Sequence, residues 1–194
     1  KSGVGNAVIV GIDNGNAWRD SELTPKSIGV VQHLEMLCED FKPEGEIFDN
    51  FLMNTVIPYV ENNFPICTDR QNVAVCGSSS GGLMSFFSAF EHPEKFGYAG
   101  VFSPAFLCYT REDWAKYLST KIVENMPYLY IYTGNGDELE EMIFESTEML
   151  YELLEESFYP YDRMNEVILF ENAHNEKSWR EIFPDFLHTF LSRL

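Results

Sequence analysis

A short turn near the middle of the chain constrains its fold more than any other stretch. An apolar run over residues 73–76 ends in a cluster of glycines and serines, and a second apolar stretch covers residues 83–90. This order predicts a buried strand, a tight turn and a helix. Residues 77–81 fit the pattern G-x-S-x-G, in which a sharp strand-to-helix turn exposes the central serine, here Ser79. We expect side chains at positions 77 and 81 to collide with the neighbouring strand or helix, so that only glycine fits there.

The same composition, Gly-Ser-Ser-Ser-Gly-Gly, is also common in flexible linkers. Linkers are not usually flanked by an apolar strand on one side and an apolar helix on the other, so we favour the exposed serine. The helix that follows would point its N-terminus at the reacting oxygen, where unpaired N–H groups and the helix dipole favour negative charge.

The charge balance excludes some classes of partner. The 194 residues hold 31 Asp and Glu against 13 Lys and Arg, which gives a formal charge of −18. Nucleic acids and anionic membranes attract basic surfaces, so we predict neither as a partner. Hydrophobic residues make up 45% of the chain, and its length suits one globular domain over residues 1–194. No apolar run is long enough to span a bilayer.

The cysteines and the first residues bear on the compartment. The four cysteines follow no metal-binding spacing: Cys38, Cys67, Cys76 and Cys108. We interpret them as reduced thiols of an intracellular, cytoplasmic protein, with Cys76 acting as a small apolar side chain in a buried strand. The sequence shows no signal peptide, and it begins without methionine directly before an apolar run. We therefore expect it to be part of a longer protein.

Strand-like and helix-like segments alternate along the chain. Apolar, β-rich runs predict strands at residues 7–12, 73–76, 96–102, 127–133 and 166–170, and helical periodicity predicts helices at residues 46–61, 83–90, 111–124, 138–157 and 178–194. Pro58 could kink the first of these helices. The alternation predicts a mainly parallel sheet with helices on both faces. In such sheets, ligands bind beyond the carboxyl ends of the strands.

A serine becomes a good nucleophile when a base, usually a histidine held by a third group, takes its proton. His174 lies in the short loop directly after the last predicted strand, and this loop would face the same edge of the sheet as Ser79. The other three histidines lie in an ill-defined segment, at a helix end and in the last helix: His33, His92 and His188. We therefore predict His174 as the general base.

The carboxylate that orients the histidine should follow another strand. Asp137 comes just after the predicted strand at residues 127–133, in a glycine-rich turn between the serine and the histidine. Three nearby acids compete with it, and we expect them to begin the acidic helix: Glu138, Glu140 and Glu141. An N-cap is the alternative role for Asp137. We predict Asp137 as the orienting carboxylate, and the order Ser79, Asp137, His174 is that of α/β-hydrolases.

Several pieces in a fixed order resemble one family. The pieces are residues 8–13 with 19–25, 51–59, 77–82, 92–104, 134–137 and 174–179. Together they resemble the putative-esterase family of α/β-hydrolases, which includes esterase D-like enzymes, feruloyl and acetyl-xylan esterases, and enterobactin esterases. The resemblance implies the α/β-hydrolase fold, with Ser79 as nucleophile, Asp137 as acid and His174 as base.

One departure from the family concerns the N-terminal strands. Members normally have two or three further strands before the piece that resembles residues 8–13, and a loop after one of them supplies a second oxyanion-hole N–H. Here only the N–H of Ser80 can be assigned to the oxyanion hole. We expect the missing strands to precede Lys1, because the first strand would otherwise be an exposed sheet edge.

The resemblance implies a serine carboxylesterase that forms an acyl-enzyme and needs no metal or organic cofactor. Its expected substrates are small-molecule or carbohydrate-linked esters, such as feruloyl or acetyl esters. Trp18, Arg19 and Tyr109 are candidates for the substrate cleft, although core packing is the commoner use of aromatic residues. Two alternatives remain: acyl transfer to a sugar acceptor, as in mycolyltransferase-like relatives, and a non-catalytic binding domain on a hydrolase scaffold.

Overall fold

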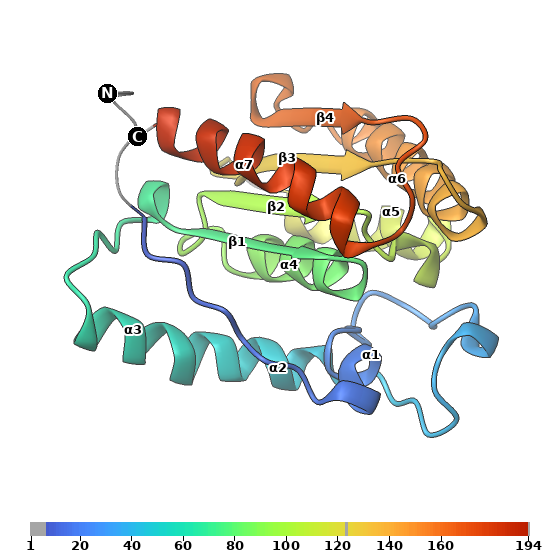
Figure 1. Ribbon diagram of the computed structural model, residues 1–194, viewed down its shortest axis with the longest axis horizontal. Helices are drawn as coiled ribbons and strands as arrows, with labels where there is room; N and C mark the ends of the chain where they lie inside the picture. The colour runs from blue at the N-terminus through green and yellow to red at the C-terminus, as the bar shows by residue number, and fades with distance from the viewer. Residues whose placement is uncertain (1–6, 123, 194) are drawn as a thin grey trace.

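The computed structural model describes residues 7–122 and 124–193. Four strands form one parallel sheet in the order β1-β2-β3-β4, with the bounds Ala74–Ser78, Tyr98–Phe102, Tyr128–Thr133 and Met164–Ile168 (Figure 1). Their carboxyl ends therefore lie along one edge of the sheet. The loops that carry Ser79, Asp137 and His174 all leave from this edge.

Helices cover both faces of the sheet, as the alternation predicts (Figure 1). The helices are α1 Arg19–Glu22, α2 Gly45–Phe51, α3 Ile57–Asn63, α4 Ser80–Glu91, α5 Arg111–Lys121, α6 Glu138–Glu156 and α7 Glu176–Ser192. Helix α7 lies on one face, while α4, α5 and α6 lie on the other. Residues 123 and 194, which the sequence prediction includes in two of the helices, lie outside the described residues.

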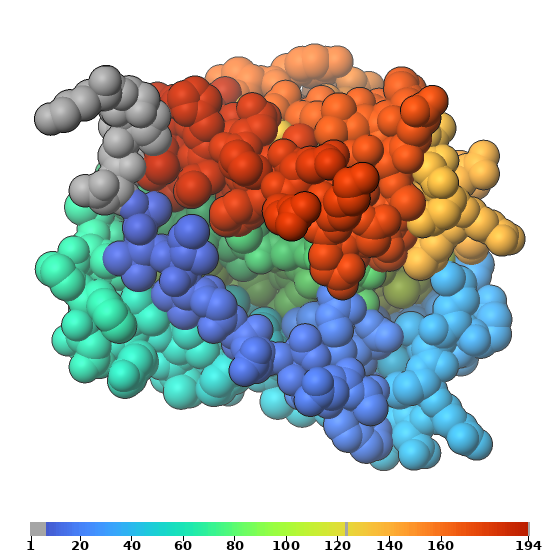
Figure 2. Space-filling view, in the orientation of Figure 1, coloured from blue at the N-terminus to red at the C-terminus, as the bar shows by residue number. Residues whose placement is uncertain are grey.

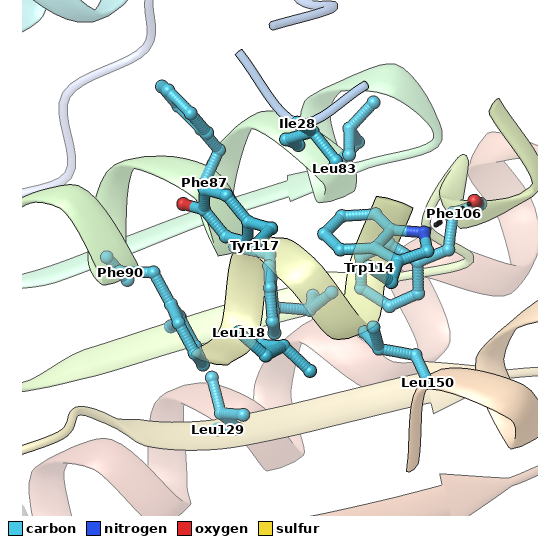
Figure 3. Packing of buried hydrophobic residues seen from close by; sticks show 14 of the residues in the cluster. Ile28, Leu83, Phe87, Phe90, Phe106, Trp114, Tyr117, Leu118, Leu129 and Leu150 are labelled. Carbon is cyan, nitrogen blue, oxygen red and sulfur yellow. Dashed lines mark hydrogen bonds between the residues drawn. The ribbon is translucent and has the colours of Figure 1, made fainter. Parts of the chain in front are cut away.

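The side chains of β3 show how the two cores divide. Tyr128, Tyr130 and Tyr132 point toward α7, and the alternate residues Leu129 and Ile131 join the core under α4, α5 and α6. This is the period of two expected of a strand that is buried on both faces. In the second core, Trp114 packs edge-on against Phe86 and Phe106 and donates its indole N–H to the Phe106 carbonyl at 3.0 Å (Figure 3).

The predicted strand at residues 7–12 is not formed. Residues 7–15 have no regular secondary structure, and Val8, Ile9 and Val10 are 53%, 66% and 46% exposed. Figure 2 shows this segment, in blue, on the surface between the C-terminal and teal segments. A strand needs hydrogen bonds from a neighbouring strand, and no described residue pairs with this one in the sheet.

The strand predicted at residues 73–76 is formed, but the prediction that it is buried is wrong. Within the described residues β1 is one of the two edge strands of the sheet, and Cys76 is exposed. All four cysteines are free. No helix in the described ranges is both long enough and apolar enough to cross a membrane.

The first predicted helix continues past Pro58 without a non-helical residue. Helices α2 and α3 are joined by a π-helical stretch, Leu52–Val56, and Pro58 lies in the first turn of α3. Proline lacks an N–H and its ring crowds the preceding turn. The wider π-helical turn, not a kink at Pro58 alone, accommodates both effects.

Candidate active site

Ser79 lies in a strained turn between β1 and α4. Its backbone angles are φ 59° and ψ −125°, in a region that non-glycine residues rarely adopt. The Ser79 N–H donates to the Phe102 carbonyl at 2.9 Å, and the Ser79 carbonyl accepts from the N–H groups of Leu83 at 3.0 Å and Ala105 at 3.1 Å. Such strain, about 1–3 kcal/mol, persists where surrounding contacts over-determine the conformation.

The glycines around Ser79 are needed at positions 77 and 82. A Cβ at Gly77 would lie 2.5 Å from the Gly81 carbonyl oxygen, and a Cβ at Gly82 would lie 2.8 Å from that of Phe102. The prediction that a side chain at Gly81 would also collide is wrong. A Cβ there would meet only Arg19 Nη2, at 3.8 Å, which is an ordinary contact.

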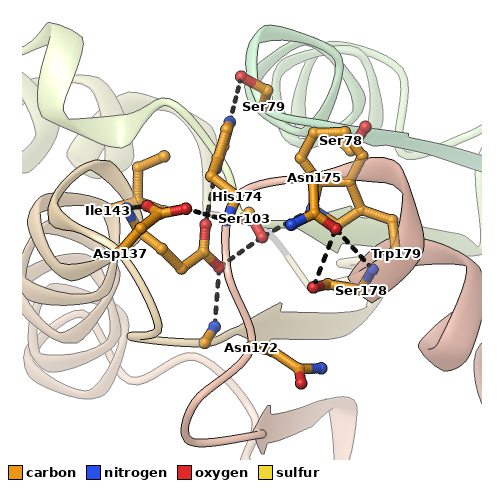
Figure 4. Close-up of polar contacts among 12 residues, drawn as sticks. Ser78, Ser79, Ser103, Asp137, Ile143, Asn172, His174, Asn175, Ser178 and Trp179 are labelled. Carbon is orange, nitrogen blue, oxygen red and sulfur yellow. Dashed lines mark hydrogen bonds and ion pairs between the residues drawn. The ribbon is translucent and has the colours of Figure 1, made fainter.

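His174 and Ser79 lie within hydrogen-bond distance of each other. His174 lies in the loop between β4 and α7, and its Nε2 is 3.0 Å from Ser79 Oγ (Figure 4). The imidazole is only 10% exposed. Trp179, in the first turns of α7, meets the ring edge-on, with the two ring centroids 5.0 Å apart. This packing fixes the plane of the imidazole.

Glu140, not Asp137, holds the other nitrogen of the imidazole. Glu140 Oε2 lies 2.6 Å from His174 Nδ1, and the Glu140 side chain is completely buried. The second oxygen, Oε1, accepts from the Gly134 N–H at 2.8 Å and from the Ser103 hydroxyl at 2.6 Å. The carboxylate is therefore out of water but fully hydrogen-bonded, as a buried charge must be.

The prediction that Asp137 orients the imidazole is wrong because Asp137 caps α6. Its Oδ1 accepts from the Glu140 N–H and its Oδ2 from the His174 backbone N–H, both at 2.8 Å (Figure 4). Burial alone would raise the pKa of Asp137, but these two N–H groups hold that pKa below its ordinary value. Asp137 thus fixes the backbone of His174 and leaves the ring to Glu140.

The helical phase of α6 could have identified Glu140. The buried residues of this helix include Ile143, Thr147, Leu150 and Leu154. Glu140 continues this stripe by three residues toward the N-terminus, so its side chain points into the protein.

Ser103 links Glu140 to Trp179. The Ser103 hydroxyl donates to Glu140 and accepts the indole N–H of Trp179 at 2.9 Å (Figure 4). Ser103 is fully buried at the end of β2, has φ 41°, and donates its own N–H to the Tyr132 carbonyl at 2.7 Å. Nothing in the sequence marks Ser103 as a site residue, because a serine after a strand has no distinctive pattern.

The three residues predicted for the substrate cleft differ in their burial and contacts. Tyr109 is 2% exposed, donates its hydroxyl to the Pro25 carbonyl and packs edge-on against Trp114, so its predicted place in a cleft is wrong. Trp18 is 52% exposed. Arg19 Nη2 donates to the Ser78 carbonyl at 3.0 Å, next to Ser79.

A cavity of about 500 Å³ opens beside His174. Its lining residues are Met36, Asp137, Glu138, Leu139, Met142 and His174. Three of these side chains are apolar and two are acidic. A larger cavity of about 840 Å³ lies among α2, α4 and α5, and neither Ser79 nor His174 lines it. Within residues 7–122 and 124–193, no group of three or more His, Cys, Asp or Glu could hold a metal ion.

A family model matches almost the whole chain. The model of the "Putative esterase" family matches residues 1–190. An endo-1,4-β-xylanase/feruloyl esterase of Xylanibacter ruminicola is 32% identical over 107 residues, which cover 55% of this chain and 13% of that protein.

Two solved structures share the fold. The enterochelin esterase of Shigella flexneri has a TM-score of 0.63 at 19% identity, with 74% of this chain and 36% of that chain covered. The siderophore hydrolase EstA of Aspergillus nidulans has a TM-score of 0.63 at 18% identity, with 90% and 65% covered. The fold is that of α/β-hydrolases, and the chain spans less than two thirds of the length of each of these relatives.

Proposed function

Because the chain belongs to the "Putative esterase" family, we propose that it is a serine carboxylesterase that works through Ser79, His174 and Glu140. The observation that carries the proposal is the unbroken series of contacts from Ser79 Oγ to His174 Nε2, and from His174 Nδ1 to the buried Glu140 carboxylate. A nucleophile, a base and a group that orients the base are the parts that acyl transfer requires.

In the proposed mechanism, Ser79 Oγ attacks the ester carbonyl carbon while His174 Nε2 takes the hydroxyl proton. Glu140 keeps the proton of His174 on Nδ1 and stabilises the imidazolium that forms, since their charges are opposite and out of water. The tetrahedral oxyanion accepts a hydrogen bond from the N–H of Ser80. This residue lies in the first turn of α4, where N–H groups have no partner within the helix.

The intermediate collapses when His174 gives its proton to the alcohol oxygen and the C–O bond breaks. This leaves an acyl group on Ser79. Water then attacks the acyl carbon as His174 takes one of its protons, and the acid leaves with Ser79 Oγ reprotonated. His174 accepts or donates the proton in each of these steps.

We propose uncharged acyl esters, such as feruloyl or acetyl groups linked to carbohydrate, as the substrate class. The named feruloyl esterase activity of the Xylanibacter relative supports it. So does the cavity beside His174, because Met36, Leu139 and Met142 offer apolar surface to an acyl group or its alcohol. The acids Asp137 and Glu138 at the same cavity disfavour anionic substrates.

A fluorophosphonate probe tests the proposal, because it reacts only with an activated serine. We expect one probe per protein molecule by intact mass, and no labelling of the Ser79→Ala variant. A panel of methyl ferulate, p-nitrophenyl acetate and an anionic catecholate ester then tests the substrate class. Absence of labelling in the wild-type protein would overturn the serine mechanism, and preference for the anionic ester would overturn the substrate class.

A further inference from the structure

The two residues that flank Ser79 are both held by one short helix from a distant part of the chain. Arg19 Nη2 donates to the Ser78 carbonyl at 3.0 Å, and Asp20 Oδ1 accepts from the Ser80 hydroxyl at 2.7 Å. Arg19 and Asp20 begin α1, about sixty residues before the turn. We call these two residues the elbow clamp.

The two side chains of the elbow clamp also contact each other. Arg19 Nη1 lies 3.3 Å from Asp20 Oδ1, so this one oxygen binds both the guanidinium and the Ser80 hydroxyl. The side chains of Arg19 and Asp20 are 32% and 36% exposed. Arg19 Nη2 also lies 3.8 Å from the place that a Cβ of Gly81 would take, which puts a positive charge over the first turn of α4.

Helix α1 is itself anchored away from the sheet. The Ser21 hydroxyl accepts from the Lys42 N–H at 3.0 Å, and the Ser21 carbonyl accepts from the Glu44 N–H at 2.8 Å. Ser21 is 2% exposed, and Leu23 is buried in the core under α4, α5 and α6. The elbow clamp therefore joins the turn to the segment before α2, independently of the contacts that β2 makes with Ser79.

We propose that Asp20 and Arg19 are positioning residues that fix the Ser80 N–H as an oxyanion donor. Asp20 acts through the Ser80 hydroxyl, and Arg19 acts through the Ser78 carbonyl. The Arg19 guanidinium also offsets the negative charge of Asp20 close to the place where the oxyanion forms. This inference rests on the proposed esterase function and deepens it, since it assigns Arg19 to the turn and not to the substrate.

The proposal makes a kinetic prediction that a purely structural role does not. A misplaced oxyanion donor weakens binding of the tetrahedral intermediate but not of the ester. With p-nitrophenyl acetate as substrate, we expect Asp20→Ala to lower kcat about 10-fold or more with KM little changed, because a hydrogen bond to a charged group is lost. Asp20→Asn keeps an oxygen acceptor for Ser80 and should recover most of that loss.

A double-mutant cycle tests whether Asp20 acts through Ser80. Ser80→Ala removes the hydroxyl but keeps the backbone N–H. We expect Asp20→Ala to have little further effect in the Ser80→Ala background. Glu22→Ala is the matched control: Glu22 belongs to the same helix but accepts from the Gly15 N–H, and its loss should leave kcat unchanged. If Asp20→Ala does not fold, the same cycle is measured with Asp20→Leu, which is close to aspartate in size and also lacks an oxygen acceptor for the Ser80 hydroxyl.

If the losses of kcat in Asp20→Ala and Ser80→Ala multiply in the double variant, the proposal is overturned. A rise in KM at constant kcat in Asp20→Ala would also overturn it, because it would mean that Asp20 contacts the substrate. Unchanged kcat in Asp20→Ala would overturn it too. Failure of the esterase function looks different: the wild-type protein would then show no hydrolysis that depends on Ser79.

Discussion

At the scale of single residues, the site depends on how one buried carboxylate is satisfied. Glu140 has no exposed surface, and its two oxygens bind the His174 ring, the Gly134 N–H and the Ser103 hydroxyl. A buried charge that loses a partner leaves an unmet desolvation penalty, so each partner contributes to the position of Glu140 and, through it, of His174.

Removal of the Ser103 hydroxyl should therefore reduce turnover. We expect Ser103→Ala to lower kcat about 10-fold with KM nearly constant, because Glu140 loses one charge-assisted hydrogen bond. Steady-state hydrolysis of a neutral ester measures this. Ser88→Ala is the control. The Ser88 hydroxyl is equally buried and also donates to a carboxylate, that of Asp49, but Ser88 lies near the C-terminal end of α4, away from Ser79. Equal loss of activity in both variants would show only a general effect on stability.

At the scale of elements, the turn between β1 and α4 is tight on one side and open on the other. The backbone of Gly77 is pressed against the Gly81 carbonyl, whereas Gly81 itself faces open space apart from Arg19. The two outer glycines of the G-x-S-x-G pattern thus have different physical roles here.

Alanine substitutions should separate these two roles. Gly77→Ala should lower the free energy of unfolding by about 1–3 kcal/mol, because its Cβ overlaps backbone that cannot move away. Gly81→Ala should raise it by up to about 1 kcal/mol, because alanine is the better residue within a helix. Urea unfolding curves measure both changes. Equal destabilisation by the two substitutions would contradict this description of the turn.

The sequence predicts the elements well where periodicity determines them. The strands that end near the site and the helices that follow them occur in the predicted order, and the loops of Ser79 and His174 meet at the predicted edge. The apolar run at residues 7–12 was wrongly predicted to be a strand, because an apolar run becomes a strand only beside a partner strand. Tyr109 was wrongly predicted for a similar reason. The residue type alone does not reveal whether an aromatic ring faces a cleft or the core.

The choice of carboxylate depends on less than one helical turn. Asp137 and Glu140 are three residues apart, and both follow β3. Which of them reaches the imidazole depends on where α6 begins, because the cap residue points back along the backbone and the residue three later turns inward. Helix starts are among the least certain features of a sequence-based prediction.

At the scale of the whole molecule, the formal charge of −18 acts on every approaching substrate. Two acids that line the cavity beside His174, Asp137 and Glu138, add to this negative field. A negative field lowers the local concentration of anions, and added salt screens it.

The charge predicts a salt dependence that differs between two esters. For p-nitrophenyl acetate, kcat/KM should stay nearly constant as sodium chloride rises. The mono-p-nitrophenyl ester of succinic acid carries a carboxylate, so its kcat/KM should be lower at low salt. Between about 0.01 M and 0.15 M salt it should rise several-fold, because the added ions screen the repulsion between the ester and the protein. The same salt response for both esters would show that charge does not select substrates here.

The central claim, that Glu140 orients His174 for attack by Ser79, is tested most directly by comparing Glu140→Gln with Asp137→Asn. Glutamine matches the shape of Glu140 but cannot hold the imidazolium, so we expect kcat/KM to fall about 10²–10⁴-fold. Asparagine remains a good N-cap, so Asp137→Asn should lose less than about 10-fold. A large loss in Asp137→Asn together with near-normal kcat/KM in Glu140→Gln would contradict the account.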